Sequence, residues 1–214
     1  MIEAPTQRFA EVVNTEEELR ALLGHPSELA IKKVQPRLDE HCRDFIARLP
    51  FMLLGSVDGA GNCDVSPRGD APGFVLVLDE QTLLIPDRPG NKRFDSLLNI
   101  IQNGAVGLLF MIPAIEETLR INGRACIVRD PELLQRLEAQ GKVPTLALAV
   151  AVEEAFVHCA KSLKRAHLWD PESWADGSTL APRARMFIDH AAVTGVSVEQ
   201  MEASLAVSYK KNLY

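Results

Sequence analysis

The feature that most constrains the fold is a series of short strand-like segments between residues 51 and 157. These segments are apolar or alternate apolar with polar residues, and Gly, Asp and Asn cluster between them, as expected for strands and turns. Only two helical patterns interrupt them, at 92–103 and 131–140. This order favours a small closed or split barrel over a doubly wound sheet. The strands are expected at 51–57, 62–66, 74–78, 82–85, 105–112, 118–128 and 145–156.

The return strand after the Asp58–Asn62 turn carries a break. Pro67 interrupts it, and proline donates no main-chain hydrogen bond to a sheet. We therefore expect this strand to end at Ser66.

Both ends of the chain have helical patterns. Thr15 precedes three glutamates and then leucines at helical spacing up to Gly24, which predicts a capped helix. Further helices are expected at 36–48, 161–169, 182–193 and 197–208. No linker is long or polar enough to divide the chain. We expect one domain over 1–214, with a helical N-terminal extension (1–50), a barrel core (51–157) and a helical C-terminal extension (158–214).

Composition limits the function. Among 214 residues, 47% are apolar, and the formal net charge is −6. Nucleic-acid and anionic-membrane binders need broad basic surfaces, so neither partner is expected. The four cysteines have no CxxC spacing, and no metal site is predicted. No export signal or membrane-spanning run is found, which favours a cytoplasmic protein with reduced thiols.

The segment 85–93 carries the clearest chemical signal. A strand ends there in a glycine-containing loop with three cations, Arg88, Lys92 and Arg93, and a helix is expected to follow at once. Free amides at a helix N-terminus and nearby cations bind anions, and arginine suits phosphate. A solvated basic turn is the alternative. Further cations support the phosphate interpretation. Arg68 lies in the break after Ser66-Pro67, and Arg120 and Arg124 lie on another expected strand.

The carboxylates near these cations have ordinary explanations. Asp70 and Asp87 are interpreted as turn-forming or arginine-orienting residues, and no catalytic residue is assigned.

Four ordered motifs resemble the pyridoxamine 5′-phosphate oxidase-related flavoproteins, and most closely an FMN-dependent bacterial branch. They are Asp64-Val-Ser-Pro-Arg-Gly-Asp70, Leu84-Ile-Pro-Asp-Arg-Pro-Gly-Asn-Lys-Arg93, Val106-Gly-Leu-Leu-Phe110 and Glu117-Thr-Leu-Arg-Ile-Asn-Gly-Arg-Ala125. The resemblance covers roughly residues 30–170. It implies a mainly β, α+β fold: a split β-barrel of the FMN-binding type, working as a homodimer with the cofactor at the subunit interface.

The resemblance also assigns residues to the cofactor. Lys92 and Arg93 match the family's basic pair at a helix start, and Arg68 matches a region that supplies another phosphate-binding arginine. Ile85 and Pro86 match the segment whose backbone runs beside the flavin. Thr118 stands near the place of a glutamine that contacts the cofactor, with Arg120 as its substitute or supplement. Lys161 is expected to reach the flavin phosphate or a substrate anion. A solvated helix face is the alternative. The full expected FMN site is Ser66, Arg68, Ile85, Pro86, Arg88, Asn91, Lys92, Arg93, Thr118, Arg120 and Lys161.

The expected function is an FMN-dependent oxidoreductase acting on an unidentified small molecule, in which the flavin transfers electrons or hydride. A non-catalytic flavin or haem carrier is the alternative. True pyridoxamine 5′-phosphate oxidase activity is less favoured. The arginine and histidine arrangement with which that enzyme binds the substrate phosphate has no counterpart in 181–214.

Overall fold

A computed structural model describes residues 8–214, so the first seven residues of the expected N-terminal extension lie outside it. The chain separates into two compact units, Met1–Val34 and Gln35–Tyr214. The described part of the first unit holds α1 (Glu16–Leu23) and α2 (Glu28–Lys32). Thr15 Oγ1 accepts a hydrogen bond from the Glu18 N–H, and Gly24 ends α1 at a φ of +77°, which confirms the predicted helix and both of its ends.

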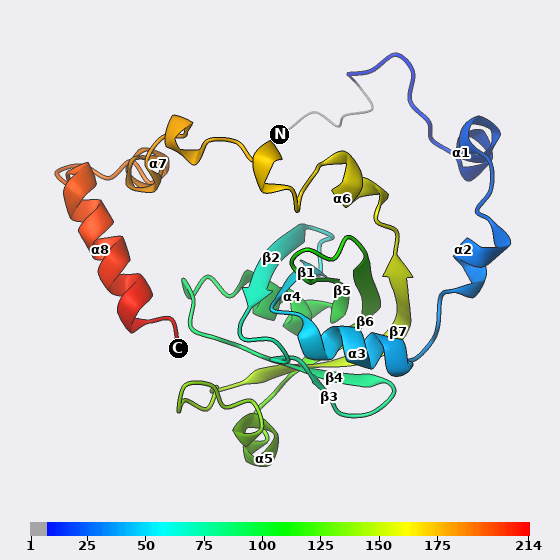
Figure 1. The fold of residues 1–214 in the computed structure, drawn as a ribbon, viewed down its shortest axis with the longest axis horizontal. Coiled ribbons are helices and arrows are strands. Elements are labelled where there is room, and N and C mark those ends of the chain that lie inside the picture. The colour runs from blue at the N-terminus through cyan, green and yellow to red at the C-terminus, as the bar shows by residue number, and fades with distance from the viewer. Residues whose placement is uncertain (1–7) are drawn as a thin grey trace. The chain divides into compact units, whose positions relative to one another are not determined.

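The second unit is built on one seven-stranded sheet in which every neighbouring pair is antiparallel (Figure 1). The strand order is β2-β1-β5-β6-β7-β4-β3. The mainly β, α+β class expected from the sequence is confirmed. The strands are β1 (Phe51–Val57), β2 (Cys63–Gly69), β3 (Leu76–Val77), β4 (Thr82–Pro86), β5 (Ala105–Met111), β6 (Thr118–Val128) and β7 (Ala147–His158).

Strand β2 continues past the expected break at Pro67. Its register with β1 runs unbroken from Cys63 to Gly69, and Pro67 stands opposite Leu53. The expectation that the strand ends at Ser66 was wrong because β2 lies at the edge of the sheet, where a proline nitrogen can face away from the ladder. The extra length carries Arg68 along the sheet.

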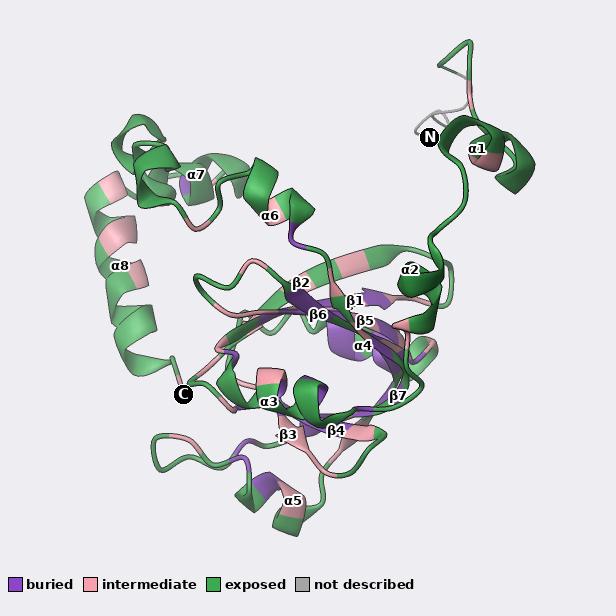
Figure 2. Ribbon diagram, turned by 45° about the vertical axis from the view of Figure 1, so that its right-hand side comes forward, coloured by how far each residue is buried: buried purple, intermediate pink, exposed green. Residues whose placement is uncertain are grey.

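The core lies between the sheet and two helices, α3 (Glu40–Arg48) and α4 (Asp95–Gln102). Figure 2 shows the buried residues concentrated on the strands and on the inner faces of these helices. Strand β1 alternates buried and less buried positions, as a sheet with one packed face requires. Helix α3 packs against β3 and β7, and α4 packs against β1, β2 and β6.

Helix α4 begins three residues later than expected. Lys92 and Phe94 have left-handed backbones, with φ values of +60° and +62°, so the helix cannot include them. Asn99 fixes the helix to the sheet, because its Nδ2 donates to Ser56 Oγ at 3.1 Å and to Asp64 Oδ2 at 2.9 Å. The loop 87–94 therefore runs from β4 to a firmly seated helix.

Of the remaining helices, the last is longer than the sequence pattern suggested, the other α-helices are shorter, and the two 3₁₀ turns were not expected. They are α5 (Pro131–Gln135), α6 (Lys161–Arg165), the 3₁₀ turns η2 (Pro171–Ser173) and η3 (Gly177–Thr179), α7 (Arg183–His190) and α8 (Val198–Lys211). The capping arrangement expected at Ser197 is confirmed, since Ser197 and Gln200 form a reciprocal capping box. Arg183 Nη2 and Glu202 Oε2, 2.9 Å apart, connect α7 to α8.

A β-bulge between Asn122 and Gly123 interrupts the pairing of β6 with β7. A Cβ atom at Gly123 would overlap the main-chain oxygen of Ala151 on the neighbouring strand. By contrast, a Cβ at Gly55 would lie 3.4 Å from the Gly107 oxygen, an ordinary contact. The two glycines therefore differ in how much room the sheet leaves them.

We expect Gly123→Ala to lower the free energy of unfolding by roughly 1–3 kcal/mol, because β7 must move to accept the methyl group. Gly55→Ala, the matched control, should change it by less than about 1 kcal/mol. Urea unfolding of both variants measures the difference. Equal effects would contradict the close approach of β6 and β7 at the bulge.

Candidate functional site

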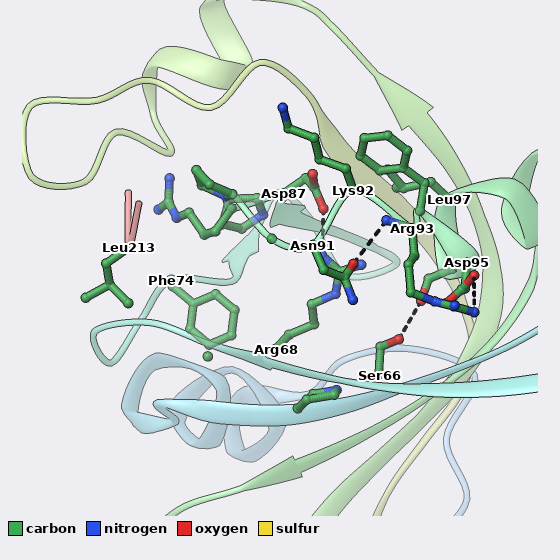
Figure 3. A pocket seen from close by; sticks show the side chains of 18 residues that line it. Ser66, Arg68, Phe74, Asp87, Asn91, Lys92, Arg93, Asp95, Leu97 and Leu213 are labelled. Carbon is green, nitrogen blue, oxygen red and sulfur yellow. Dashed lines mark hydrogen bonds and ion pairs between the residues drawn. The ribbon is translucent and has the colours of Figure 1, made fainter. Parts of the chain in front are cut away.

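A cleft of about 430 Å³ lies between edge strand β2, the loop 87–94 and the start of α4. Figure 3 shows side chains from all three elements turned toward it. The residues that line it are Ser66, Pro67, Arg68, Gly69, Phe74, Pro86, Asp87, Arg88, Pro89, Gly90, Asn91, Lys92, Arg93, Phe94, Asp95, Ser96, Leu97 and Leu213. Seven of the eleven predicted site residues are in this set: Ser66, Arg68, Pro86, Arg88, Asn91, Lys92 and Arg93.

Arg68 reaches from β2 to the loop. Its Nη1 donates to Asp87 Oδ1 at 2.6 Å, and both side chains are about four-fifths buried. Its Nε is buried and has no hydrogen-bond partner within the described part of the chain. A buried donor without a partner costs roughly 1–3 kcal/mol, so an anion that accepts this N–H would recover that energy.

The start of α4 also offers unsatisfied donors. Its N-cap residue is Phe94, whose side chain cannot accept a hydrogen bond from the first turn. The neighbouring Ser96 and Leu97 line the cleft. Ser96 Oγ donates to Ser66 Oγ at 3.1 Å, which connects α4 to β2 across the cleft. The cleft is therefore bordered by a helix N-terminus and by hydroxyl groups, both of which suit an oxyanion.

Lys92 and Arg93 differ in what they contact. Arg93 Nε donates to Asp95 Oδ2 at 2.9 Å on the exposed rim. Lys92 has no ion pair with any residue in 8–214, and its side chain points away from Ser66 and Arg68 (Figure 3). Both add positive charge near the helix start, and both are exposed, whereas Arg68 is largely buried.

Arg88 is fixed by the protein itself. Its Nε lies 2.6 Å from Asp70 Oδ2, and its Nη2 donates to the Leu137 carbonyl at 3.0 Å. Tyr214 Oη donates to the other oxygen of Asp70 at 2.5 Å, and the Arg88 guanidinium lies 5.7 Å from the centre of the Tyr214 ring. The arginine-orienting role expected of Asp70 and Asp87 is confirmed. Sequence reasoning missed Tyr214, because it stands 144 residues from Asp70.

The other four predicted residues lie outside the cleft. Ile85 is fully buried in the core next to Pro86. Thr118 is buried at the start of β6, Arg120 lies 5.0 Å from the centre of the Phe156 ring, and Lys161 is the first residue of α6. Thr118, Arg120 and Lys161 therefore do not line the cleft of their own chain.

The decisive comparison is with protein families. A family model described as "Pyridoxamine 5'-phosphate oxidase" matches residues 38–159, which include every strand and the cleft apart from Leu213. This chain belongs to the pyridoxamine 5′-phosphate oxidase family. The seven-stranded sheet with α4 between β4 and β5 is the split barrel that the sequence resemblance implied for this family.

Solved structures resemble parts of this family member. HupZ from Group A Streptococcus is 20% identical over 56% of this chain and 93% of its own, with a TM-score of 0.46. A putative pyridoxamine 5′-phosphate oxidase from Lactobacillus delbrueckii is 22% identical over 57% and 95%, with a TM-score of 0.44. An FMN-binding protein from Syntrophomonas wolfei is 12% identical over 67% and 96%, with a TM-score of 0.42. The assignment of this chain to the family rests on the family model. Among curated proteins, none matches this chain significantly.

Three further observations describe this family member. Within residues 8–214, no cluster of three or more His, Cys, Asp or Glu side chains is placed to hold a metal ion. The four cysteines are unpaired, and burial raises the pKa of the Cys42 thiol to about 11. In the same range, no helix has the length and apolar character needed to cross a membrane.

The Asp70–Arg88 pair should make stability depend on acid pH. Burial opposes ionisation of Asp70, but hydrogen bonds from Tyr214, the Ala71 N–H and Arg88 hold the pKa of its carboxyl below the ordinary value of 3.8. Because the folded pKa is depressed, the stabilisation is present above about pH 4 and is lost as pH falls through the folded pKa.

We expect Asp70→Asn to lower the free energy of unfolding at pH 7 by about 3 kcal/mol, because Arg88 keeps a largely buried charge without its carboxylate. The difference in the free energy of unfolding between wild type and variant should become smaller below about pH 4. Urea unfolding across this pH range measures it. Asp189→Asn, which breaks an exposed pair with Arg185, is the control and should cost less than about 1 kcal/mol. A gap that is constant with pH would contradict this account.

Proposed function

We propose that this chain is an FMN-binding flavoprotein that transfers electrons or hydride between the flavin and a small molecule. One observation carries the proposal: the buried Arg68 Nε without a partner, at a cleft that an uncapped helix N-terminus also borders. This arrangement fits the phosphate of FMN, which accepts several hydrogen bonds and carries negative charge. Membership of the pyridoxamine 5′-phosphate oxidase family supports a flavin rather than another phosphate compound.

Several residues of the cleft have distinct parts in the proposed binding. Arg68 donates from Nε to the phosphate while Asp87 holds its guanidinium in place. Ser66 and the first turn of α4 supply neutral donors, and Lys92 and Arg93 add charge at the rim. Arg88 orients the loop 87–94 through Asp70 and so acts as a positioning residue.

The flavin ring, once bound, supplies the electron or hydride transfer. What the chain contributes is position and electrostatics. Phe74, Pro86 and Pro89 give the cleft apolar surface beside the polar donors, which excludes water from part of the site.

We further propose that a second copy of this chain completes the site. Thr118, Arg120 and Lys161 lie outside the cleft of their own chain, and the family resemblance assigns all three to the cofactor. A two-fold pair brings the β6–α6 face of one copy to the cleft of the other, because a two-fold axis makes both contacts at once. The proposed site therefore contains Arg68 from one copy and Arg120 from its partner.

The phosphate contact is tested by Arg68→Met. We expect this variant to bind FMN roughly ten- to a hundredfold more weakly, as for the loss of a charge-assisted hydrogen bond. Riboflavin, which has the same ring and no phosphate, should bind wild type and variant equally. Flavin fluorescence titration measures both affinities, with Arg129→Met as an exposed control. A protein that takes up no FMN, or equal losses for FMN and riboflavin, would overturn the phosphate assignment.

The paired site is tested by mixing two variants, Arg68→Met and Arg120→Glu. Each alone should bind FMN weakly, and light scattering of the wild type should give about twice the chain mass of 23.6 kDa. After unfolding and refolding together, about one quarter of the sites should regain tight binding, since half the dimers are mixed and each holds one intact site. A monomeric wild type, or no recovery on mixing, would contradict the pair.

Turnover is the remaining part of the proposal. Photoreduced protein is mixed with oxygen or with candidate acceptors in a stopped-flow instrument. If the flavin turns over, it should be reoxidised, and its visible absorption bands should return. A flavin that reacts with no acceptor would instead favour a carrier.

A further inference from the structure

The segment 212–214, which follows α8, returns the chain to the loop 87–94. Figure 1 shows α7 and α8 lying to one side of the sheet, and α8 has no buried residue among the fourteen that the structure describes. Leu213 then lines the proposed cofactor cleft, and Tyr214 lines a neighbouring cavity of about 510 Å³ that shares much of the loop with the cleft. The helical extension therefore meets the barrel again at the site of the proposed cofactor.

Several contacts hold Tyr214 in place. Its Oη donates to Asp70 Oδ1 at 2.5 Å, its ring lies 5.7 Å from the Arg88 guanidinium, and its main-chain oxygen accepts a hydrogen bond from Lys142 Nζ at 2.6 Å. The hydrogen bond to Asp70 raises the pKa of the Tyr214 hydroxyl above its ordinary value of 10, so this group remains a donor at neutral pH. These contacts come from separate parts of the barrel, and together they define where the segment ends.

Asp70 connects Tyr214 to the loop. Only 2% of the Asp70 side chain is exposed, one of its oxygens accepts from Tyr214, and the other pairs with Arg88 at 2.6 Å. Because water does not reach a buried carboxylate freely, it cannot fully replace a lost partner there. The same loop carries Asp87, which orients the proposed phosphate ligand Arg68. A change at Tyr214 should therefore reach the phosphate end of the cleft.

Leu213 lies at the other end of the cleft. Figure 3 shows Leu213 and Phe74 at one end, and Arg93 and Asp95, beside the start of α4, at the other. Leu213 is 64% exposed although it lines the cleft, so a molecule bound there would cover apolar surface. An end bordered by a leucine and a phenylalanine suits an aromatic ring better than a phosphate.

We propose that the segment 212–214 is a strap on the cofactor cleft, in which Tyr214 positions the loop 87–94 and Leu213 covers the flavin ring. The identity of the ring rests on the proposed FMN function. While the strap is in place, the loop keeps its phosphate donors aligned and Leu213 keeps water from the ring. Release of the strap frees the loop and allows the cofactor to exchange. Tyr214 is a positioning residue, because its hydroxyl acts through Asp70 and Arg88.

The positioning role is tested by Tyr214→Phe, which keeps the ring and removes only the hydroxyl. We expect this variant to release FMN about tenfold faster than wild type, as for the loss of a hydrogen bond to a charged group. Riboflavin, which has no phosphate, should leave both proteins at the same rate. Stopped-flow fluorescence measures the release. Tyr209→Phe, at an exposed position on α8, is the matched control and should behave as wild type.

The ring contact is tested by Leu213→Ala. This variant should release FMN and riboflavin faster by the same factor, roughly threefold to tenfold, because the two compounds share the ring. Leu180→Ala, also at an exposed position, is the control and should leave both rates unchanged. An effect on FMN alone, or no effect on either compound, would overturn the contact between Leu213 and the ring.

Hydrogen exchange in flavin-free protein separates the strap from the proposed function. We expect peptides that cover 87–94 to exchange faster in Tyr214→Phe than in Tyr209→Phe. Unchanged exchange of the loop, or FMN release at the wild-type rate, overturns the strap even in protein that binds FMN. Equal acceleration of FMN and riboflavin release in Tyr214→Phe overturns the positioning role, since a general loss of stability would act on both. Faster loop exchange in protein that takes up no flavin supports the hold of Tyr214 on the loop and overturns the proposed function instead.

Discussion

Two arginine–aspartate pairs hold the loop 87–94 in place, and the cleft that this loop lines depends on them. Arg68–Asp87 ties the loop to the edge strand β2, and Arg88–Asp70 ties it to the connection that follows β2. All four side chains are at least about four-fifths buried. A buried pair contributes little net stability against an apolar replacement, but the loss of one partner leaves a buried charge uncompensated. These pairs therefore determine where the loop lies more than how stable the barrel is.

The pairing also decides which cations remain available to a ligand. Arg88 and Arg93 have carboxylate partners, while Arg68 retains one buried donor and Lys92 has no ion pair within 8–214. The loop 87–94 of this acidic protein thus keeps a small amount of unbalanced positive charge, although both of its arginines are paired with carboxylates. Such an arrangement favours an anion of defined shape, such as a phosphate ester, over a polyanion that needs a broad basic surface.

Local sequence predicted much of the fold because its signals are local. The cap at Thr15, the turn at 58–62 and the full extent of β1 and β6 follow from neighbouring residues. Two of the errors, at Pro67 and at the start of α4, depend on tertiary context. An edge position tolerates the proline, and the left-handed residues Lys92 and Phe94 delay the helix.

The candidate site was also predicted where its signals are local in sequence and missed where they depend on the fold. A cluster of cations close together in sequence indicated the cleft, and seven predicted residues line it. The hydrogen bond from Tyr214 to Asp70 was not predictable, because only the fold brings these two residues together. Arg120 and Lys161 do not line the cleft, and no local sequence pattern shows whether they reach it in a pair of chains.

The backbone of Lys92 carries one more consequence. A left-handed φ of +60° suits glycine, and a residue with a side chain pays roughly 1 kcal/mol or more to adopt it. A lysine nevertheless stands there, two residues after Gly90, and lines the cleft. A glycine at position 92 would relax the loop, but it would also remove this cation. Selection for a sturdier fold and selection for ligand capture therefore act on this residue in opposite directions.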